Sequence, residues 1–128
     1  MKTFFLILFS SLFSFCAIRA QDGTPAIFPG GDAGWSHYLD TAFHKETMAS
    51  QMTKKDFERF GKTQSLLYTF SIMPDGTIGL INIQGQASQA VRNEIYRVLQ
   101  NCPRWTPATL NGKPTIYRKK QTSTFTFD

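Results

Sequence analysis

The chain has 128 residues, of which 41% are hydrophobic, and its 14 basic and 9 acidic side chains give a net charge of +5. This length provides one modest hydrophobic core and excludes two. The positive excess is too small to indicate nucleic acid as a partner. The two cysteines, Cys16 and Cys102, exclude a disulfide-rich scaffold.

The first twenty residues have the pattern of a secretory signal peptide. Lys2 precedes an almost wholly apolar run from Phe4 to Ala17, and small Ala20 precedes the expected cleavage. This run is shorter than the ~20 apolar residues that a spanning helix needs. We therefore expect a periplasmic or secreted protein with 12 basic and 9 acidic residues and Cys102 as its single thiol. The alternative is that this segment remains as a short uncleaved anchor. Only in that case do we expect the protein to contact a membrane.

Residues 21–62 are expected to form a lead-in with one amphipathic helix. The segment from Gln21 to Gly31 is rich in Pro and Gly, which predicts an irregular stretch ending in a turn. Asp32 is then a candidate N-cap for a helix over about 33–46. The apolar side chains of that helix follow its period: Trp35, Leu39, Ala42 and Phe43. The period of Thr47 to Gly61 is poorly defined, so this stretch is interpreted as a helix or loop connector.

A β-hairpin follows. Apolar residues alternate with other side chains from Leu66 to Met73, which predicts a strand with one buried face. Pro74-Asp75-Gly76-Thr77 is typical of a turn, and Ile78 to Gln84 predicts the second strand. The apolar parity shifts within that second strand, which indicates a β-bulge near Gly79.

A second amphipathic helix and a final strand complete the chain. The helix is predicted over Ala87 to Asn101, and Pro103 terminates it. An irregular segment with Trp105 leads to a turn at Asn111-Gly112-Lys113-Pro114. The run from Thr115 to Phe127 is rich in Thr and aromatic residues, and it predicts one long strand.

Together these elements predict an α+β fold for residues 63–128, a two-layer sandwich of a three-stranded antiparallel sheet packed against helices. Such a sheet exposes two edges. Arg118, Lys119 and Lys120 lie within the last strand, where charge is typical of an edge protected from indiscriminate pairing.

The sequence gives no positive indication of an enzyme, a cofactor or a metal. His37 and His44 are two helical turns apart, about 10 Å, so we favour a solvated polar stripe over a metal site or catalytic dyad. Cys102 lies on an apolar stripe, which favours a buried thiol over a nucleophile. Asp75 is better explained by turn chemistry than by acid catalysis. Trp105 is either a core residue, which we favour, or a binding anchor.

The ordered set of motifs resembles the C-terminal domain of the TonB energy-transducer family, in its Bacteroidetes-like form. The set comprises Asp75-Gly76-Thr77-Ile78, the second helix, Trp105-Thr106-Pro107-Ala108, Asn111-Gly112-Lys113-Pro114 and a last strand ending Phe125-Thr126-Phe127. The resemblance covers Leu66 to Phe127, and Phe28-Pro29-Gly30-Gly31 is similar to the lead-in of that group.

This resemblance implies a protein-binding module of the Gram-negative envelope that acts in outer-membrane transport. An extended peptide from an outer-membrane receptor, or another envelope protein, would add as a strand to the sheet edge. The candidate binding residues on that edge are Ile116, Arg118, Lys119, Lys120, Thr122, Thr124 and Thr126. The residues with an implied structural role are Asp75, Gly76, Trp105, Pro107, Gly112 and Pro114.

Alternatives remain open from the sequence. Charge on the edge serves equally well to prevent pairing, and the same edge can pair with a second copy to give a homodimer. A short anchored energy-transducer component and a small secreted enzyme or toxin are the two other functional readings. After the expected cleavage the mature chain lacks the anchor and proline-rich spacer of the family's transducers, so we do not expect it to energise transport itself.

Overall fold

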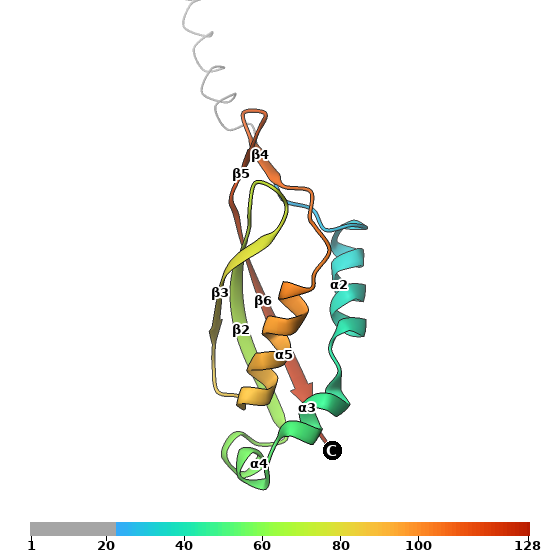
Figure 1. Cartoon of the computed structure of the whole chain (residues 1–128), viewed down its shortest axis with the longest axis vertical. Coiled ribbons are helices and arrows are strands. Elements are labelled where there is room, and N and C mark those ends of the chain that lie inside the picture. Colours follow the sequence, from blue (N-terminus) through green and yellow to red (C-terminus); the bar gives the residue numbers. More distant parts are fainter. Residues whose placement is uncertain (1–22) are drawn as a thin grey trace, which may run out of the picture.

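The computed structural model describes residues 23–128 (Figure 1). The expected signal peptide and its cleavage position after Ala20 lie outside these residues. Within them, no helix combines the length and the apolar character needed to cross a bilayer.

The fold is α+β, with one larger and one smaller antiparallel sheet. The larger sheet has the strand order β3-β2-β6, and the smaller one has the order β1-β4-β5. Helices α2 and α5 lie on one face of the larger sheet, and the smaller sheet lies at one end of the molecule (Figure 1). The elements are β1 (Gly23–Thr24), α2 (Gly31–Ala42), α3 (Lys45–Gln51), α4 (Lys54–Phe60), β2 (Thr63–Ile72), β3 (Ile78–Gln84), α5 (Gln89–Gln100), β4 (Ala108–Leu110), β5 (Lys113–Thr115) and β6 (Tyr117–Thr126).

The central strand β2 carries the core of the larger sheet. Its helix-facing side chains are Leu66, Tyr68, Phe70 and Ile72, each no more than 1% exposed. Burying side chains of this size contributes about 1.5–3 kcal/mol each. β2 pairs with β6 in one unbroken register, from Thr63 opposite Thr126 to Ile72 opposite Tyr117. The predicted strand alternation and antiparallel sheet are therefore confirmed.

The predicted bulge in β3 is also confirmed. The register of β3 against β2 shifts between Thr69 and Ser71, so that Leu80 and Ile81 together oppose Phe70. Leu80 adopts a φ of 51°, a left-handed conformation that is unfavourable for a residue with a Cβ atom. The bulge begins directly after Gly79.

The N-terminal helix differs from its prediction over 33–46. Helix α2 ends at Ala42, and Gly30, not Asp32, occupies the N-cap position. Its end is fixed by the second long helix: Arg97 of α5 donates to the Ala42 carbonyl at 2.6 Å, and Glu94 accepts from the His44 backbone N–H at 2.7 Å. These long-range bonds stop the helix where sequence periodicity would continue it.

The connector after α2 is helical. It forms α3 and α4, each seven residues long, and α4 begins at a capping box between Thr53 and Asp56. Two turns are too few to establish a clear apolar period, which explains the poor signal in this stretch.

The smaller sheet was not expected. The predicted long last strand is β6, which begins at Tyr117, whereas β5 lies largely in the predicted turn and pairs with β4. The turn between β4 and β5 has left-handed Asn111 and Gly112, as a tight Asn-Gly hairpin requires. Strand β1 from the lead-in, expected to be irregular, pairs with β4. Strands of two or three residues are too short to show alternation.

Trp105 ties the hairpin turn to the core. It is 4% exposed and its ring packs against those of Phe28, Trp35 and Phe70. Its backbone N–H donates to the Gly76 carbonyl at 2.9 Å, and a Cβ atom on Gly76 would lie 2.2 Å from the Trp105 carbonyl oxygen. Asp75 accepts two hydrogen bonds from Thr77. Asp75, Gly76 and Trp105 thus hold the turn in place, as turn chemistry and a core tryptophan predict.

Candidate peptide-binding edge

The outer edge of β6 has no strand partner among residues 23–128. Strand β6 is ten residues long and pairs only with β2 within this part of the chain. Alternate residues of a strand direct their backbone N–H and C=O groups to opposite sides, so about five residues of β6 direct theirs away from β2. These groups are available to a further strand.

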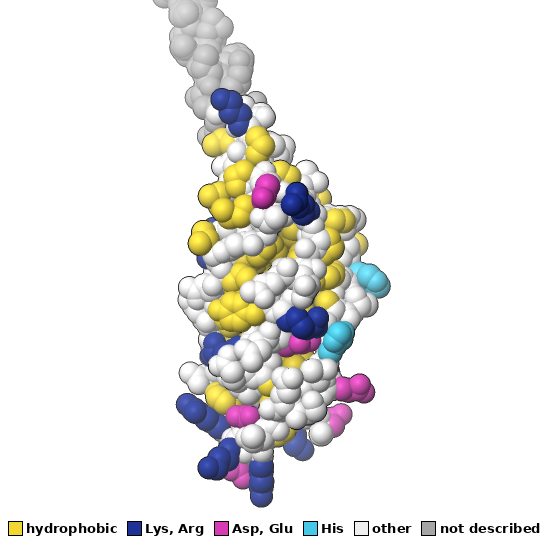
Figure 2. All heavy atoms as spheres, viewed as in Figure 1, with side chains coloured by type: hydrophobic (Ala, Val, Ile, Leu, Met, Phe, Trp, Pro, Cys, Tyr) yellow, Lys and Arg dark blue, Asp and Glu magenta, His cyan; other side chains and the backbone are white. Residues whose placement is uncertain are grey.

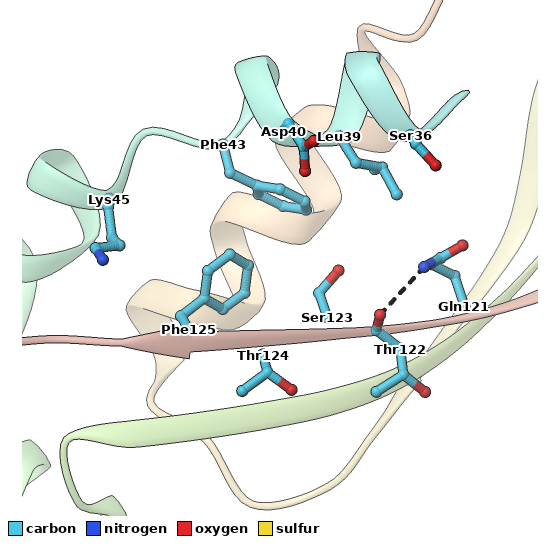
Figure 3. Close-up of a pocket in the computed structure, with 10 residues that line it drawn as sticks. All are labelled: Ser36, Leu39, Asp40, Phe43, Lys45, Gln121, Thr122, Ser123, Thr124 and Phe125. Carbon is cyan, nitrogen blue, oxygen red and sulfur yellow. Dashed lines mark hydrogen bonds between the residues drawn. The ribbon is translucent and has the colours of Figure 1, made fainter. Parts of the chain in front are cut away.

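The two faces of β6 have different surroundings. One set of side chains faces the helices: Tyr117, Lys119, Gln121, Ser123 and Phe125. The other set lies on the face without helices: Arg118, Lys120, Thr122, Thr124 and Thr126. Figure 3 shows this alternation for the segment from Gln121 to Phe125. On the open face Thr124 and Thr126 hydrogen-bond to Ser65 and Thr63 of β2, at 2.7 and 3.2 Å.

A groove of about 460 Å³ lies between α2 and β6. Ser36, Leu39 and Asp40 of α2 point toward the strand, as does Phe43, which directly follows the helix (Figure 3). Phe43 packs edge-to-face on Phe125 at 4.9 Å, at one end of the groove. We call this space the α2 groove. It has an apolar floor and a polar rim beside an unpaired strand edge.

A second hollow of about 500 Å³ lies farther along the same strand, beside Tyr117 and Lys119. Its other walls come from the lead-in, from α2 and from the aromatic cluster around Trp105. We call it the lead-in hollow. Trp35 lines this hollow, and Gln121 lines the α2 groove. Nε1 of Trp35 donates a hydrogen bond to Oε1 of Gln121 at 3.0 Å. Both spaces therefore follow the helix-facing side of β6.

All the expected binding residues except Ile116 lie on β6, but their side chains have different surroundings. The guanidinium of Arg118 donates to Ser71 Oγ, the Leu80 carbonyl and Thr69 Oγ1, at 2.9, 2.8 and 2.7 Å. Arg118 is therefore held across the sheet, although the residue remains exposed. Lys119 lines the lead-in hollow, whereas Lys120 is exposed on the open face. Ile116, outside both strands, is 50% exposed, and Thr122 is also exposed.

The remaining implied structural residues belong to the smaller sheet and its approach. Gly112 and Pro114 are exposed in the β4–β5 hairpin, and Pro107 is half-buried. None of the three lines the α2 groove or the lead-in hollow.

The candidate catalytic groups are the two histidines and Cys102. Both histidines are exposed (Figure 2), and His44 lies beyond the end of α2. Burial raises the pKa of the Cys102 thiol, although a hydrogen bond from Trp105 Nε1 at 3.4 Å opposes the shift. A raised pKa disfavours the thiolate that a nucleophile needs. Among residues 23–128, no cluster of three or more His, Cys, Asp and Glu side chains could hold a metal ion.

Sequence reasoning missed the contacts that position α2 beside β6. Glu94, whose side chain is 7% exposed, accepts two hydrogen bonds from Arg97, at 2.9 and 2.7 Å. The hydrogen bond from Arg97 lowers the pKa of Glu94, a shift that burial opposes and the His44 backbone N–H reinforces. This Glu94–Arg97 pair joins α5 to the end of α2. The sequence feature that could have indicated this pair is the carboxylate of Glu94, which lies next to the apolar stripe of α5.

The groove residues of α2 were also missed. Ser36 and Asp40 are exposed polar positions on an amphipathic helix, and nothing in their spacing distinguishes them from an ordinary solvated face. Their role depends on where α2 crosses β6, which is a tertiary property.

No known protein-family model matches the sequence, and no curated protein is significantly similar to it. The function of the chain is therefore inferred from the β6 edge and the two spaces beside it.

Proposed function

We propose that this protein is a non-enzymatic binding module of the bacterial envelope, periplasmic or secreted, that takes an extended peptide as a fourth strand on β6. The peptide would belong to an outer-membrane receptor or another envelope protein, as the resemblance to TonB C-terminal domains implies. The observation that carries this proposal is the unpaired outer edge of β6, ten residues long and regular throughout.

An edge of this kind favours strand addition for a physical reason. Regular unpaired backbone groups form a template for an incoming chain, and main-chain hydrogen bonds supply affinity. Proteins usually blunt such edges with bulges, prolines, charged side chains or covering segments, and of these β6 has charged side chains. Between Tyr117 and Thr126 the pairing with β2 has no bulge and the sequence has no proline.

The charge of the edge indicates an acidic ligand. From Asn111 to Phe127 the chain contains Lys113, Arg118, Lys119 and Lys120 and no acidic residue. Arg118 also hydrogen-bonds across the sheet, and Lys120 is a further exposed cation on the open face of β6. An acidic side chain on the added strand would lie close to it.

A titration followed by NMR tests the strand addition. Isotope-labelled protein, purified from the periplasm of an expressing host, is titrated with an acidic extended peptide of about nine residues. Amide shifts are expected to concentrate between Tyr117 and Phe127. Two N-methylated peptides sharpen the test. In one peptide the methyl groups replace the N–H groups that would donate to β6, and in the other they replace the N–H groups that point away from β6. Equal binding by both methylated peptides, or no binding by the unmodified one, would contradict the proposal.

The charge preference has a matched control. Lys120→Glu should weaken binding of the acidic peptide about fivefold, the effect of about 1 kcal/mol from one exposed charge. Lys55→Glu makes the same change on α4, at the end of the molecule where charges of both signs gather (Figure 2). This variant should bind as the original protein does. Equal weakening by both variants would indicate a general effect of net charge.

A further inference from the structure

We propose that the protein recognises two large apolar side chains of the added strand that are four residues apart. One enters the α2 groove and the other enters the lead-in hollow. This inference rests on the proposed strand addition and adds the side chains that the ligand must carry.

The first step concerns the faces of the added strand. Side chains of a strand alternate between its two faces, so every second side chain of the ligand would face the helix layer. On that side Ser36 and Leu39 of α2, and Phe43 directly after it, face the space beside β6 (Figure 3). The ligand would therefore be covered by α2 on one face and open to solvent on the other.

The second step concerns spacing. Ser123 is the middle residue of the β6 segment that lines the α2 groove, and Lys119 lines the lead-in hollow. These positions are four residues apart, about 13 Å along a strand at 3.3 Å per residue. Two side chains on the same face of an extended peptide, at i and i+4, have the same separation. The Trp35–Gln121 hydrogen bond lies at the level between them.

The third step concerns the lining. The α2 groove has three apolar lining residues, Leu39, Phe43 and Phe125, among seven polar ones, and the lead-in hollow is lined by rings that include Phe28 and Trp105. Apolar and aromatic walls favour aliphatic or aromatic ligand side chains. Each space is large enough for one such side chain.

Peptides of about nine residues test the spacing. One carries Phe at its third and seventh residues among Thr and Glu, and the other has the same composition with Phe at the third and sixth. The first should bind at least tenfold more tightly, as measured by calorimetry, because only its aromatic side chains share one face. Equal affinities would overturn this inference and leave strand addition standing. Failure of both peptides to bind would overturn the proposed function as well.

Filling the α2 groove provides an independent test. Ser36 and Asp40 are exposed and line the groove, so Ser36→Trp and Asp40→Trp should each occupy it and abolish the advantage of the third-and-seventh peptide. His37→Trp places the same side chain on α2 at an exposed position that does not line the groove, and the advantage should persist. Thermal unfolding establishes that each variant is folded. An undiminished advantage in both groove variants would overturn the inference.

Discussion

The two edges of the larger sheet are built differently. Strand β3 has seven residues, a bulge at Leu80 and a turn fixed to Trp105. Strand β6 has ten residues in unbroken register with β2. A bulge twists an edge and disrupts its pattern of donors and acceptors, so β3 is a poor template for another chain and β6 is a good one.

One cation connects the two edges. Arg118 extends from β6 across β2, and its guanidinium donates to the carbonyl of Leu80 in the β3 bulge. Arg118, a candidate ligand-binding residue, also supports the bulge in the opposite edge strand. Substitutions on the β3 side should therefore alter stability, whereas those on the outer side of β6 should alter binding.

The largest expected effect is at the turn that anchors β3. Gly76→Ala would place a Cβ atom 2.2 Å from the Trp105 carbonyl oxygen at a φ of +88°. The clash and the strain together should lower the free energy of unfolding by about 3 kcal/mol, measured by urea denaturation. Gly112→Ala is the matched control, with φ +81° and no atom within 4 Å of the new Cβ. Gly112→Ala should lower the free energy of unfolding by only about 1 kcal/mol. Equal losses in the two variants would refute the role of the Trp105 contact.

The next effect concerns the Glu94–Arg97 pair, which holds α2 beside β6. The pKa of Glu94 lies below its ordinary value when folded, so its stabilising contribution is present above the unfolded pKa and disappears as the pH falls through the folded pKa. Glu94→Gln should lower the free energy of unfolding by about 2 kcal/mol at pH 7. Below about pH 4.5 the stability of this variant should decline less steeply than that of the original protein.

Urea denaturation from pH 7 to pH 3 measures this effect. Glu46→Gln, at an exposed position in the first turn of α3, is the control and should retain the original pH dependence. An identical decline in all three proteins would show that Glu94 does not contribute to acid sensitivity.

The smallest effect lies in the bulge itself. Leu80 is 68% exposed at a left-handed φ, so Leu80→Gly removes strain and sacrifices little buried area. Its free energy of unfolding should rise by about 0.5–1 kcal/mol. Asn82→Gly, on the same strand without a positive φ, should instead be destabilising by about 1 kcal/mol. If Leu80→Gly lowered the free energy of unfolding, the packing of the leucine side chain would contribute more to stability than the strain at its φ costs.

The elements with a strong local pattern were predictable from the sequence. Strand β2 shows its buried face through alternation from Leu66 to Ile72, and α5 shows an apolar stripe followed by Pro103. The end of α2 was not predictable, because Glu94 and Arg97 determine it from more than fifty residues away in the chain. The short strands β1, β4 and β5 contain too few residues to give a period.

The candidate site was predictable only in part. Charge and β-propensity located the edge strand, since Lys119 and Lys120 lie within β6. The direction of each side chain depends on its partners, and Arg118 is retained by Ser71 and Thr69 of the neighbouring strand. The walls contributed by Leu39 and Phe43 depend on how α2 packs, which no local pattern specifies.

The pairing of β2 with β6 also determines when this domain is able to fold. Thr63 and Thr126 are opposite each other although they are 63 residues apart in the chain. The sheet therefore cannot close until β6 has been synthesised, because its central strand lacks one neighbour until then. Contacts of such long sequence separation form slowly. We therefore expect closure of the β2–β6 pair to be a late step in folding.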